Sequence, residues 1–277
     1  MVKVDCKKYA DEILESVKNI PGKTRGLLVL YAGDNPASAA YMRGKKKDCE
    51  RCGIPFHSIC CVDQRELISA IQWANCDSTI GGIIVQLPLP VGFDEDEALD
   101  YIAPEKDVDG FKPNSPFKPC TPEGIVHIMH KEIGYDLSGK RALIIGRGKL
   151  VGRPLYELLQ YHENMEVMQL NSFEKYLHSI TNHSPSGVMW NCIITATGTP
   201  NLLDVCKCNT NLVIDAGITR GADGKLCGDC FNFEGLAHLE RIYRGYNPHI
   251  TTVPGGVGLL TRAILMKHMG EVQSYVR

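Results

Sequence analysis

The sequence predicts an α/β protein of two domains, and three observations carry that prediction. The 277 residues are enough for two domains of ordinary size. Short apolar runs rich in β-branched residues alternate with helix-length segments, which is typical of parallel sheets covered by helices. In the middle of the chain, the apolar run 141–145 leads directly into a glycine-rich turn at 146–152. A strand, a glycine turn and a helix start in this order are typical of a doubly wound domain.

The first half of the chain predicts a small parallel sheet with crossover helices. Strand-like runs bounded by glycine and polar residues lie at 26–31, 56–62 and 82–86. Apolar residues that recur three and four positions apart predict helices at 6–19, 36–52 and 65–75. Asp34 and Pro36 suit the start of the second of these helices.

The second half repeats the alternation. We expect a helix from a cap at Thr121, with Pro122 at its first position, to about Glu132. Strands are expected at 142–145, 166–170, 192–196 and 212–215, and a last helix at 259–269 returns to the first domain. The expected boundaries are 1–133 with 256–277 for the first domain, and 134–255 for a second domain of Rossmann type.

The glycine turn reads Gly146-Arg147-Gly148-Lys149-Leu150-Val151-Gly152. Backbone amides at such a turn and the positive end of the following helix favour a pyrophosphate, so a nucleotide cofactor is the first hypothesis. The spacing is G-x-G-x-x-x-G and differs from the usual dinucleotide fingerprint. A plain strand-to-helix turn is the alternative.

Composition and charge exclude several classes of protein. The net charge is −2 and no long block of like charge occurs, so we expect a small-molecule partner, with no nucleic acid and no membrane. No apolar run approaches the roughly 20 residues of a membrane span, and residues 1–5 lack a signal-peptide core, so we expect a cytoplasmic protein. Two C-x-x-C pairs occur among 12 cysteines, Cys49 with Cys52 and Cys227 with Cys230. A zinc site is one interpretation, but we expect mostly packing thiols and no metal.

Three short motifs carry candidate chemistry. Tyr41 and Lys45 stand four residues apart and share one helix face, although a run of lysines is usually a solvated surface. Gln86 is the polar residue at the carboxyl end of a buried strand, where open parallel sheets bind ligands, but it could simply satisfy loop amides. Asp107 and Asp109 precede Gly110, where acids are usually turn formers. A Y-x-x-x-K pair also occurs in short-chain dehydrogenases, but there it follows the glycine turn.

Together with the glycine turn and two further segments, these three motifs resemble those of the bifunctional methylenetetrahydrofolate dehydrogenase/cyclohydrolase family. They occur in family order and over nearly the whole chain. The matching segments are Tyr41-x-x-x-Lys45, Gln86-Leu87-Pro88-Leu89-Pro90, Lys106-Asp107-Val108-Asp109-Gly110, Pro119-Cys120-Thr121-Pro122, Gly146-Arg147-x-x-x-Val151-Gly152-x-Pro154 and Pro254-Gly255-Gly256-Val257-Gly258. The resemblance implies an N-terminal catalytic domain, a C-terminal NAD(P)-binding domain and, usually, a homodimer.

The resemblance also implies roles for individual residues. The substrate is 5,10-methylenetetrahydrofolate in a cleft between the domains, with Tyr41 stacked on its aromatic parts and Asp109 bonded to the pterin. Pro254, Gly255 and Gly256 line the folate site from the other domain. Lys45, oriented by Gln86, activates water for hydrolysis of the methenyl product to 10-formyltetrahydrofolate.

For the cofactor, the resemblance favours NADP over NAD. The second strand ends in Gln169-Leu170-Asn171-Ser172 without the acid that an NAD site usually has. Arg147 and Ser172 match the family members that use NADP. A serine is usual where this chain has Gly148. The remaining residues implied at the cofactor site are Gly146, Gly148, Val151, Gly152, Thr197, Gly198, Gly217 and Ile218.

Three alternatives remain at the level of sequence. One is a dehydrogenase of the same fold that lacks the hydrolytic step or uses NAD. Another is a folate- or nucleotide-binding module without catalysis, against which Lys45 and Asp109 argue. The third is an amino-acid-type dehydrogenase with a Rossmann second domain, which would not need Asp109 or Gln86.

Overall fold

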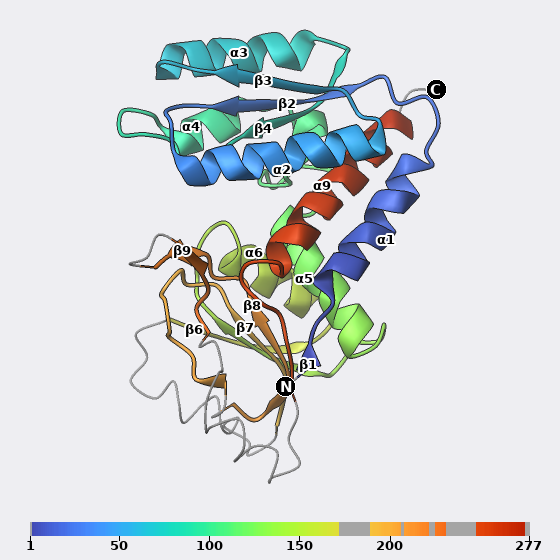
Figure 1. Ribbon diagram of the computed structural model, residues 1–277, viewed down its shortest axis with the longest axis vertical. Coiled ribbons are helices and arrows are strands. Elements are labelled where there is room, and N and C mark those ends of the chain that lie inside the picture. Colours follow the sequence, from blue (N-terminus) through green and yellow to red (C-terminus); the bar gives the residue numbers. More distant parts are fainter. Residues whose placement is uncertain (1, 172–188, 206–207, 222–224, 231–247, 275–277) are drawn as a thin grey trace. The chain divides into compact units, whose positions relative to one another are not determined.

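The computed structural model describes residues 2–171, 189–205, 208–221, 225–230 and 248–274 (Figure 1). The chain separates into two compact units. We call Ala10–Cys120 with Arg262–Arg277 the N-terminal unit, and Met1–Tyr9 with Thr121–Thr261 the C-terminal unit. Each unit has its own parallel sheet and its own core. The α/β class is confirmed. The expected domain boundaries at residues 133 and 255 remain a prediction.

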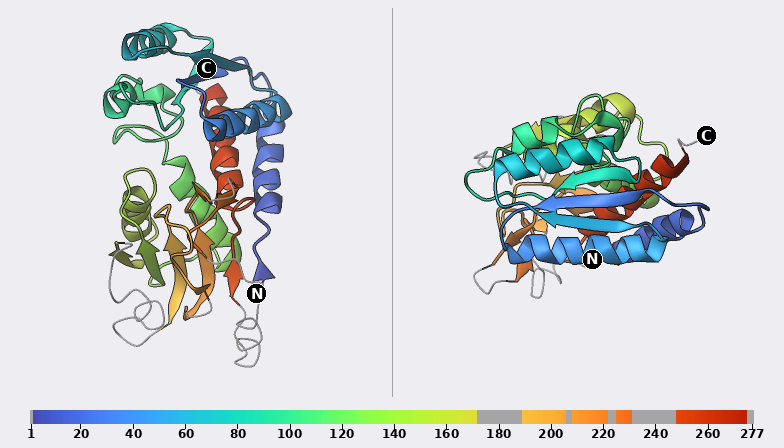
Figure 2. Two further views of the ribbon diagram at one scale, coloured as in Figure 1. Left: turned by 60° about the vertical axis from the view of Figure 1, so that its left-hand side comes forward. Right: turned by 90° about the horizontal axis from the view of Figure 1, so that it is seen from above.

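The N-terminal unit is built on a three-stranded parallel sheet in the order β3-β2-β4. Its strands are β2 (Gly26–Tyr31), β3 (Phe56–Cys60) and β4 (Ile80–Val85). The crossover helices α2 (Pro36–Cys52) and α3 (Gln64–Cys76) cover opposite faces of the sheet (Figures 1 and 2). Alternate residues of β2 therefore face different helices, and Leu28 and Leu30 pack with Leu67 and Ile71 of α3.

Capping explains where α3 begins. The Asp63 carboxylate accepts a hydrogen bond of 2.8 Å from the Glu66 backbone amide, and the Glu66 carboxylate accepts one from the Val62 amide. After β4, a short helix α4 (Glu95–Asp100), capped in the same way by Asp94, and a 3₁₀ turn (Pro104–Lys106) complete the loop region.

The last helix, α9 (Val257–Ser274), was expected to return to the first domain, and this expectation is confirmed. From Arg262 onward α9 belongs to the N-terminal unit. A Cβ atom on Gly82 of β4 would lie 2.6 Å from Met269 Sδ, so the glycine lets the helix pack directly on the strand. The helix is longer than the expected 259–269, because it buries apolar residues at both ends, Val257 and Val272.

The C-terminal unit contains a six-stranded parallel sheet in the order β1-β11-β8-β7-β5-β6. Its strands are β5 (Arg141–Ile145), β6 (Glu166–Leu170), β7 (Trp190–Thr195), β8 (Thr210–Asp215), β11 (His249–Ile250) and β1 (Val2–Lys3). A two-stranded hairpin, β9 (Thr219–Arg220) with β10 (Leu226–Cys227), lies outside this sheet. Successive strands leave β5 first to one side and then to the other, so the strand order reverses at β5. This reversal is the switch point at which doubly wound sheets bind ligands.

Three helical segments contribute residues to this unit. Helix α1 (Cys6–Lys18) follows β1 and continues into the N-terminal unit. Helix α5 (Cys120–Glu132) starts at Cys120, so the expected cap at Thr121 is wrong. The Thr121 hydroxyl instead lies 3.0 Å from that of Thr261. Helix α6 (Gly152–Glu157) follows the glycine turn and continues as a π-helix (Leu158–His162).

In the described part of the chain, every helix is too short or too polar to span a membrane.

Candidate active site

Lys45 of α2 and Gln86, the residue after β4, meet in the interior of the N-terminal unit. Lys45 is 8% exposed and its ammonium nitrogen Nζ donates a hydrogen bond of 3.0 Å to Gln86 Oε1. The Gln86 amide is oriented in turn, because its Nε2 donates to the Leu87 carbonyl at 2.9 Å. Burial is the main cause that holds the pKa of Lys45 below the usual lysine value. A buried lysine of this kind can act as a neutral base.

The loop after α4 brings Asp109 toward this lysine. The negative charge of Asp109 acts on Lys45 and partly opposes the lowering of its pKa by burial. The preceding acid, Asp107, is 2% exposed and accepts backbone hydrogen bonds from Gly110 and Lys112 at 3.1 and 2.8 Å. Asp107 thus shapes the loop, and Asp109 is the acid that keeps a partly exposed side chain.

Gly110 and Lys106 determine the backbone conformation of the same loop. Gly110 has φ of 75°, and a Cβ atom on it would lie 2.4 Å from the Lys118 carbonyl oxygen. The Lys106 ammonium group donates to the carbonyls of Ala74 and Asp77 at 2.6 and 2.8 Å. The K-D-V-D-G motif therefore contains three residues that hold the loop, Lys106, Asp107 and Gly110, and one partly exposed acid, Asp109.

Tyr41 lies one helical turn before Lys45 on α2, as the spacing predicts. Its side chain is half-buried, and burial raises the pKa of its hydroxyl, whereas the positive charge of Arg262 lowers it. The aromatic ring, the ammonium group, the amide and the carboxylate predicted from three separate motifs therefore all belong to the N-terminal unit.

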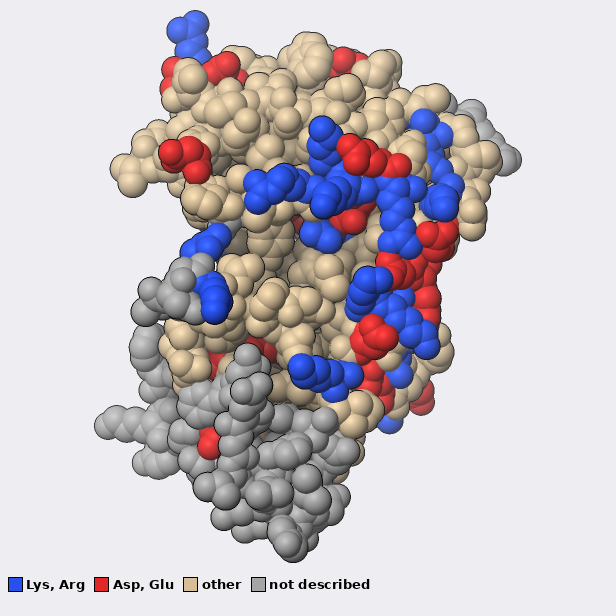
Figure 3. Space-filling model, viewed as in Figure 1, with Lys and Arg blue, Asp and Glu red and all other residues tan. Residues whose placement is uncertain are grey.

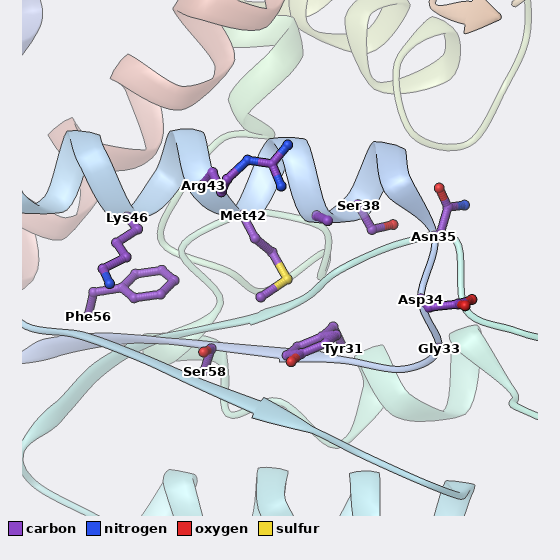
Figure 4. A pocket seen from close by; sticks show the side chains of 11 residues that line it. Tyr31, Gly33, Asp34, Asn35, Ser38, Met42, Arg43, Lys46, Phe56 and Ser58 are labelled. Carbon is purple, nitrogen blue, oxygen red and sulfur yellow. The ribbon is translucent and has the colours of Figure 1, made fainter. Parts of the chain in front are cut away.

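A second feature of α2 is a pocket of about 430 Å³ between this helix and the strands β2 and β3 (Figure 4). Met42 of the helix points toward Tyr31 of β2 in this view, and Arg43 and Lys46 line the helix side. Neither Tyr41 nor Lys45 lines the pocket, which is therefore not part of the lysine site.

In the C-terminal unit, the glycine turn lies at the switch point of the sheet. Gly146 has φ of 123°, and a Cβ atom on it would lie 2.4 Å from the Ala196 carbonyl oxygen. A Cβ atom on Gly152 would lie 2.3 Å from the Gly146 carbonyl oxygen. Gly148, in contrast, has open space around it. Two glycines are thus required by packing, while the middle one leaves room beside the exposed backbone.

Gln169 of β6 holds this turn together, a role that the sequence analysis missed. Its side-chain amide donates to the carbonyls of both Gly146 and Gly152, at 2.9 and 2.8 Å. The Arg147 guanidinium donates to the Gln169 carbonyl at 2.9 Å, so it lies at the carboxyl end of β6. Val151 directly precedes α6, while Ser172 lies outside the described residues.

Two neighbouring loops carry the remaining cofactor candidates. The Thr197 amide and hydroxyl both donate to Asp229 Oδ2, at 2.7 and 2.9 Å, which fixes the start of the Thr197–Gly198 loop. A Cβ atom on Gly217 would lie 2.0 Å from Asp229 Oδ1, and the next residue, Ile218, is exposed. Asp229 therefore positions both loops, and the sequence analysis missed it because the contacts join segments far apart in the chain.

The predicted folate-binding segment Pro254-Gly255-Gly256 belongs to the C-terminal unit. It follows a cis Val253–Pro254 bond, and Gly255 has φ of 93°. A Cβ atom on Gly256 would lie 2.3 Å from the Thr252 carbonyl oxygen, whereas Pro254 and Gly255 are exposed. Tyr41, Lys45, Gln86 and Asp109 belong to the other unit.

The cysteines of the described residues are free thiols. Cys49 and Cys52 are buried on α2, and burial raises the pKa of both thiols. Within the described ranges, no three His, Cys, Asp or Glu side chains are grouped as a metal site would require.

Comparison with known proteins assigns both halves of the chain. Residues 4–109 match the family model of the tetrahydrofolate dehydrogenase/cyclohydrolase catalytic domain, and residues 119–276 match its NAD(P)-binding domain. A relative from Agathobacter rectalis named bifunctional protein FolD is 37% identical and covers 94% of this chain and 93% of its own.

Solved structures of related enzymes match over almost the full length. The bifunctional FolD methylenetetrahydrofolate dehydrogenase/cyclohydrolase from Campylobacter jejuni aligns over 99% of both chains with 34% identity and a TM-score of 0.86. The FolD enzyme from Trypanosoma brucei, solved with NADP cofactor and an inhibitor, covers 100% of this chain and 98% of its own with 26% identity and a TM-score of 0.82. The resemblance drawn from the motifs is confirmed. The chain belongs to the tetrahydrofolate dehydrogenase/cyclohydrolase family.

Proposed function

We propose that this protein oxidises 5,10-methylenetetrahydrofolate to 5,10-methenyltetrahydrofolate with NADP and hydrolyses that product to 10-formyltetrahydrofolate. Membership of the family supports both reactions and a role in one-carbon metabolism. The observation that carries the hydrolytic half is the buried Lys45 ammonium group bonded to Gln86. A monofunctional dehydrogenase would have no use for a lysine that is kept inside the fold and biased toward its neutral form.

Hydrolysis requires a proton to leave water and a proton to reach a ring nitrogen. Neutral Lys45 accepts the proton that water loses as its oxygen bonds to the cationic methenyl carbon. The lysine, now charged, returns a proton to the ring nitrogen as the bond between that nitrogen and the carbon breaks. As that bond breaks, the hydroxyl group on the former methenyl carbon releases its own proton to solvent, so that a formyl group remains on the other nitrogen and both protons of the water are accounted for. Gln86 keeps the Lys45 nitrogen in one position throughout, because its own amide is held by the Leu87 carbonyl.

Substrate binding uses the other residues of the predicted set. Tyr41 offers an aromatic face for the folate rings, and Asp109 offers a carboxylate that matches the amino group and ring nitrogen of a pterin. Pro254, Gly255 and Gly256, which belong to the C-terminal unit, are the further residues that we assign to folate binding. The exposure of Pro254 and Gly255 and the partial exposure of Asp109 and Tyr41 support these roles.

The C-terminal unit fits a dinucleotide. The turn at Gly146, Gly148 and Gly152 lies at the switch point of the sheet, and open space surrounds Gly148. The Thr197 loop follows Ala196, whose carbonyl oxygen lies against Gly146 of the turn. Asp229 joins this loop to the one that begins at Gly217. When bound, the cofactor supplies the hydride acceptor of the first reaction. The residues of this unit bind and orient it, and we include Val151 and Ile218 among them.

Arg147 favours NADP over NAD. Its guanidinium group lies at the end of β6, where ribose hydroxyls or a 2′-phosphate bind in doubly wound domains. No carboxylate occurs among Gln169, Leu170 and Asn171 at this strand end. A guanidinium group suits a phosphate through paired, charge-assisted hydrogen bonds. The role of Ser172 rests on the sequence resemblance alone.

Replacement of Lys45 tests the proposed function. The Lys45→Met variant should lose hydrolysis of methenyltetrahydrofolate by about 100-fold or more, because it lacks the base, while some hydride transfer remains. Lys47→Met is the matched control, since Lys47 is exposed on the same helix and should leave both reactions unchanged. Hydrolysis that survives in Lys45→Met would remove the lysine from the mechanism. Absence of hydrolysis in the unaltered protein would indicate a monofunctional dehydrogenase.

We further propose that the enzyme is a cytoplasmic homodimer, as the resemblance implies. Light scattering of the purified chain should then give about twice its mass of 30.6 kDa. A mass of one chain at micromolar concentration would contradict the dimer without affecting the proposed reactions.

A further inference from the structure

Arg262 of α9 lies against the face of α2 that carries Tyr41 and Lys45. A Cβ atom on Gly44 would lie 2.0 Å from Arg262 Nη1 and 2.8 Å from its Cζ. The guanidinium group therefore occupies the space that a side chain at position 44 would need. The positive charge of Arg262 also acts on Tyr41 and on Lys45, the residue after Gly44.

Asp48 fixes this guanidinium group. Arg262 Nε lies 2.8 Å from Asp48 Oδ2, and the two side chains are 24% and 12% exposed. Asp48 lies one helical turn after Gly44 and Lys45 on α2. Burial raises the pKa of Asp48, and the charge of Arg262 opposes this rise. The pair is thus shielded from water for most of its surface, and it is held by charge, because neither Asp48 Oδ2 nor Arg262 Nε makes a well-aligned hydrogen bond.

The groups that face Lys45 come from four elements. Burial disfavours the charged form of Lys45 most strongly, Asp109 of the loop opposes burial most, and Arg262 of α9, the smallest contribution, acts with burial. Cys49 stays neutral, because burial raises its pKa. The Cys120 sulfur donates to the Val108 carbonyl and lies 3.6 Å from His268 Nδ1. Gln86 is neutral. Arg262 therefore acts against the carboxylate of Asp109.

We propose that Arg262, placed over Gly44 and paired with Asp48, is a positioning residue of the hydrolytic reaction, whose positive charge acts together with burial to disfavour the charged form of Lys45. This inference rests on the proposed role of Lys45. It assigns a function to an ion pair that would otherwise only tie α9 to α2. The two interpretations differ in what removal of the charge does to the pH dependence of hydrolysis.

The test compares Arg262→Met with Arg262→Lys in the full-length protein. Hydrolysis of methenyltetrahydrofolate is followed without dinucleotide across pH, after subtraction of the uncatalysed rate. Removal of a like charge raises the pKa of a lysine, so the acidic limb of the profile in Arg262→Met should move upward by about 0.5 to 1 pH unit. At a fixed pH on that limb, the rate should fall by about three- to tenfold. Arg262→Lys keeps the charge and should restore most of the profile.

A second variant displaces the guanidinium group without removing its charge from the chain. Gly44→Ala places a methyl group where Arg262 lies and should move the limb in the same direction, by a smaller amount. An acidic limb that stays in place in Arg262→Met, in a protein whose melting temperature shows it to be folded, would overturn the inference and leave a purely structural ion pair. Failure of the proposed function looks different, because Lys45→Met would then retain hydrolysis whatever Arg262 does.

Discussion

Within the run Lys45-Lys46-Lys47, one ammonium group lies in the interior and two lie on the surface. Lys and Arg side chains gather at the level of α2 in Figure 3. Arg43, Lys46 and Lys47 of this helix are exposed. These side chains are solvated and keep ordinary surface roles. Burial and a single amide partner distinguish Lys45 from them and bias it toward the neutral form that hydrolysis needs.

Gly146 provides a prediction at the same scale. An alanine there would combine a φ of 123° with a Cβ atom 2.4 Å from the Ala196 carbonyl oxygen. Gly146→Ala should therefore lower the free energy of unfolding by about 2 kcal/mol or more, measured by urea denaturation. Gly148→Ala is the matched control, because its Cβ atom would meet nothing within 4 Å. Its stability should change by less than about 0.5 kcal/mol. Equal effects of the two variants would show that the turn does not need its first glycine.

Some residues of the candidate site can be identified from the sequence alone, and others cannot. Tyr41, Lys45, Gln86 and Asp109 could be selected because each belongs to a short local motif. Gln169 could not, because its hydrogen bonds reach Gly146 and Gly152, which only the folded chain brings near. Arg262 has the same character, since it contacts Gly44 from the far end of the sequence.

At the scale of elements, β6 shapes the glycine turn as much as it extends the sheet. The Gln169 side chain ties the two ends of the turn, and its carbonyl holds Arg147. Gln169→Ala should loosen the turn and raise the KM for the dinucleotide several-fold in the dehydrogenase assay. Hydrolysis of methenyltetrahydrofolate should not change, because it uses no dinucleotide.

Glu166→Gln serves as the control on the same strand. Glu166 lies at the other end of β6 and pairs with Arg141 at 2.7 Å, and its side chain is 63% exposed. Such pairs contribute little, so this variant should leave the KM unchanged. A KM that stays constant in Gln169→Ala would separate the side-chain amide from cofactor binding.

Element boundaries followed the sequence where periodicity or capping was strong. Strand β2 and helix α2 have the predicted limits, because a buried apolar run and an Asp-Asn-Pro helix start define them. Strand β3 ends two residues early, at Cys60, since Cys61 turns into the core beside α3. The strands β1 and β11 have two residues each, which is too short for any periodic signal.

For the whole molecule, alternation of strands and helices predicted two parallel sheets, and the structure contains them. The switch point could be anticipated because the glycine turn directly follows a buried strand. The order of the outer strands could not, because β1 pairs with β11 from opposite ends of the chain. The lysine and the predicted folate-stacking residue belong to one unit, and the dinucleotide turn belongs to the other.

We expect one chain to perform both reactions, with NADP as its preferred cofactor. Purified protein is mixed with 5,10-methylenetetrahydrofolate and either NADP or NAD, and the absorbance of the methenyl compound is followed with time. The absorbance should rise faster with NADP than with NAD and then decay as 10-formyltetrahydrofolate forms. Absence of hydride transfer with either cofactor would contradict the proposed function.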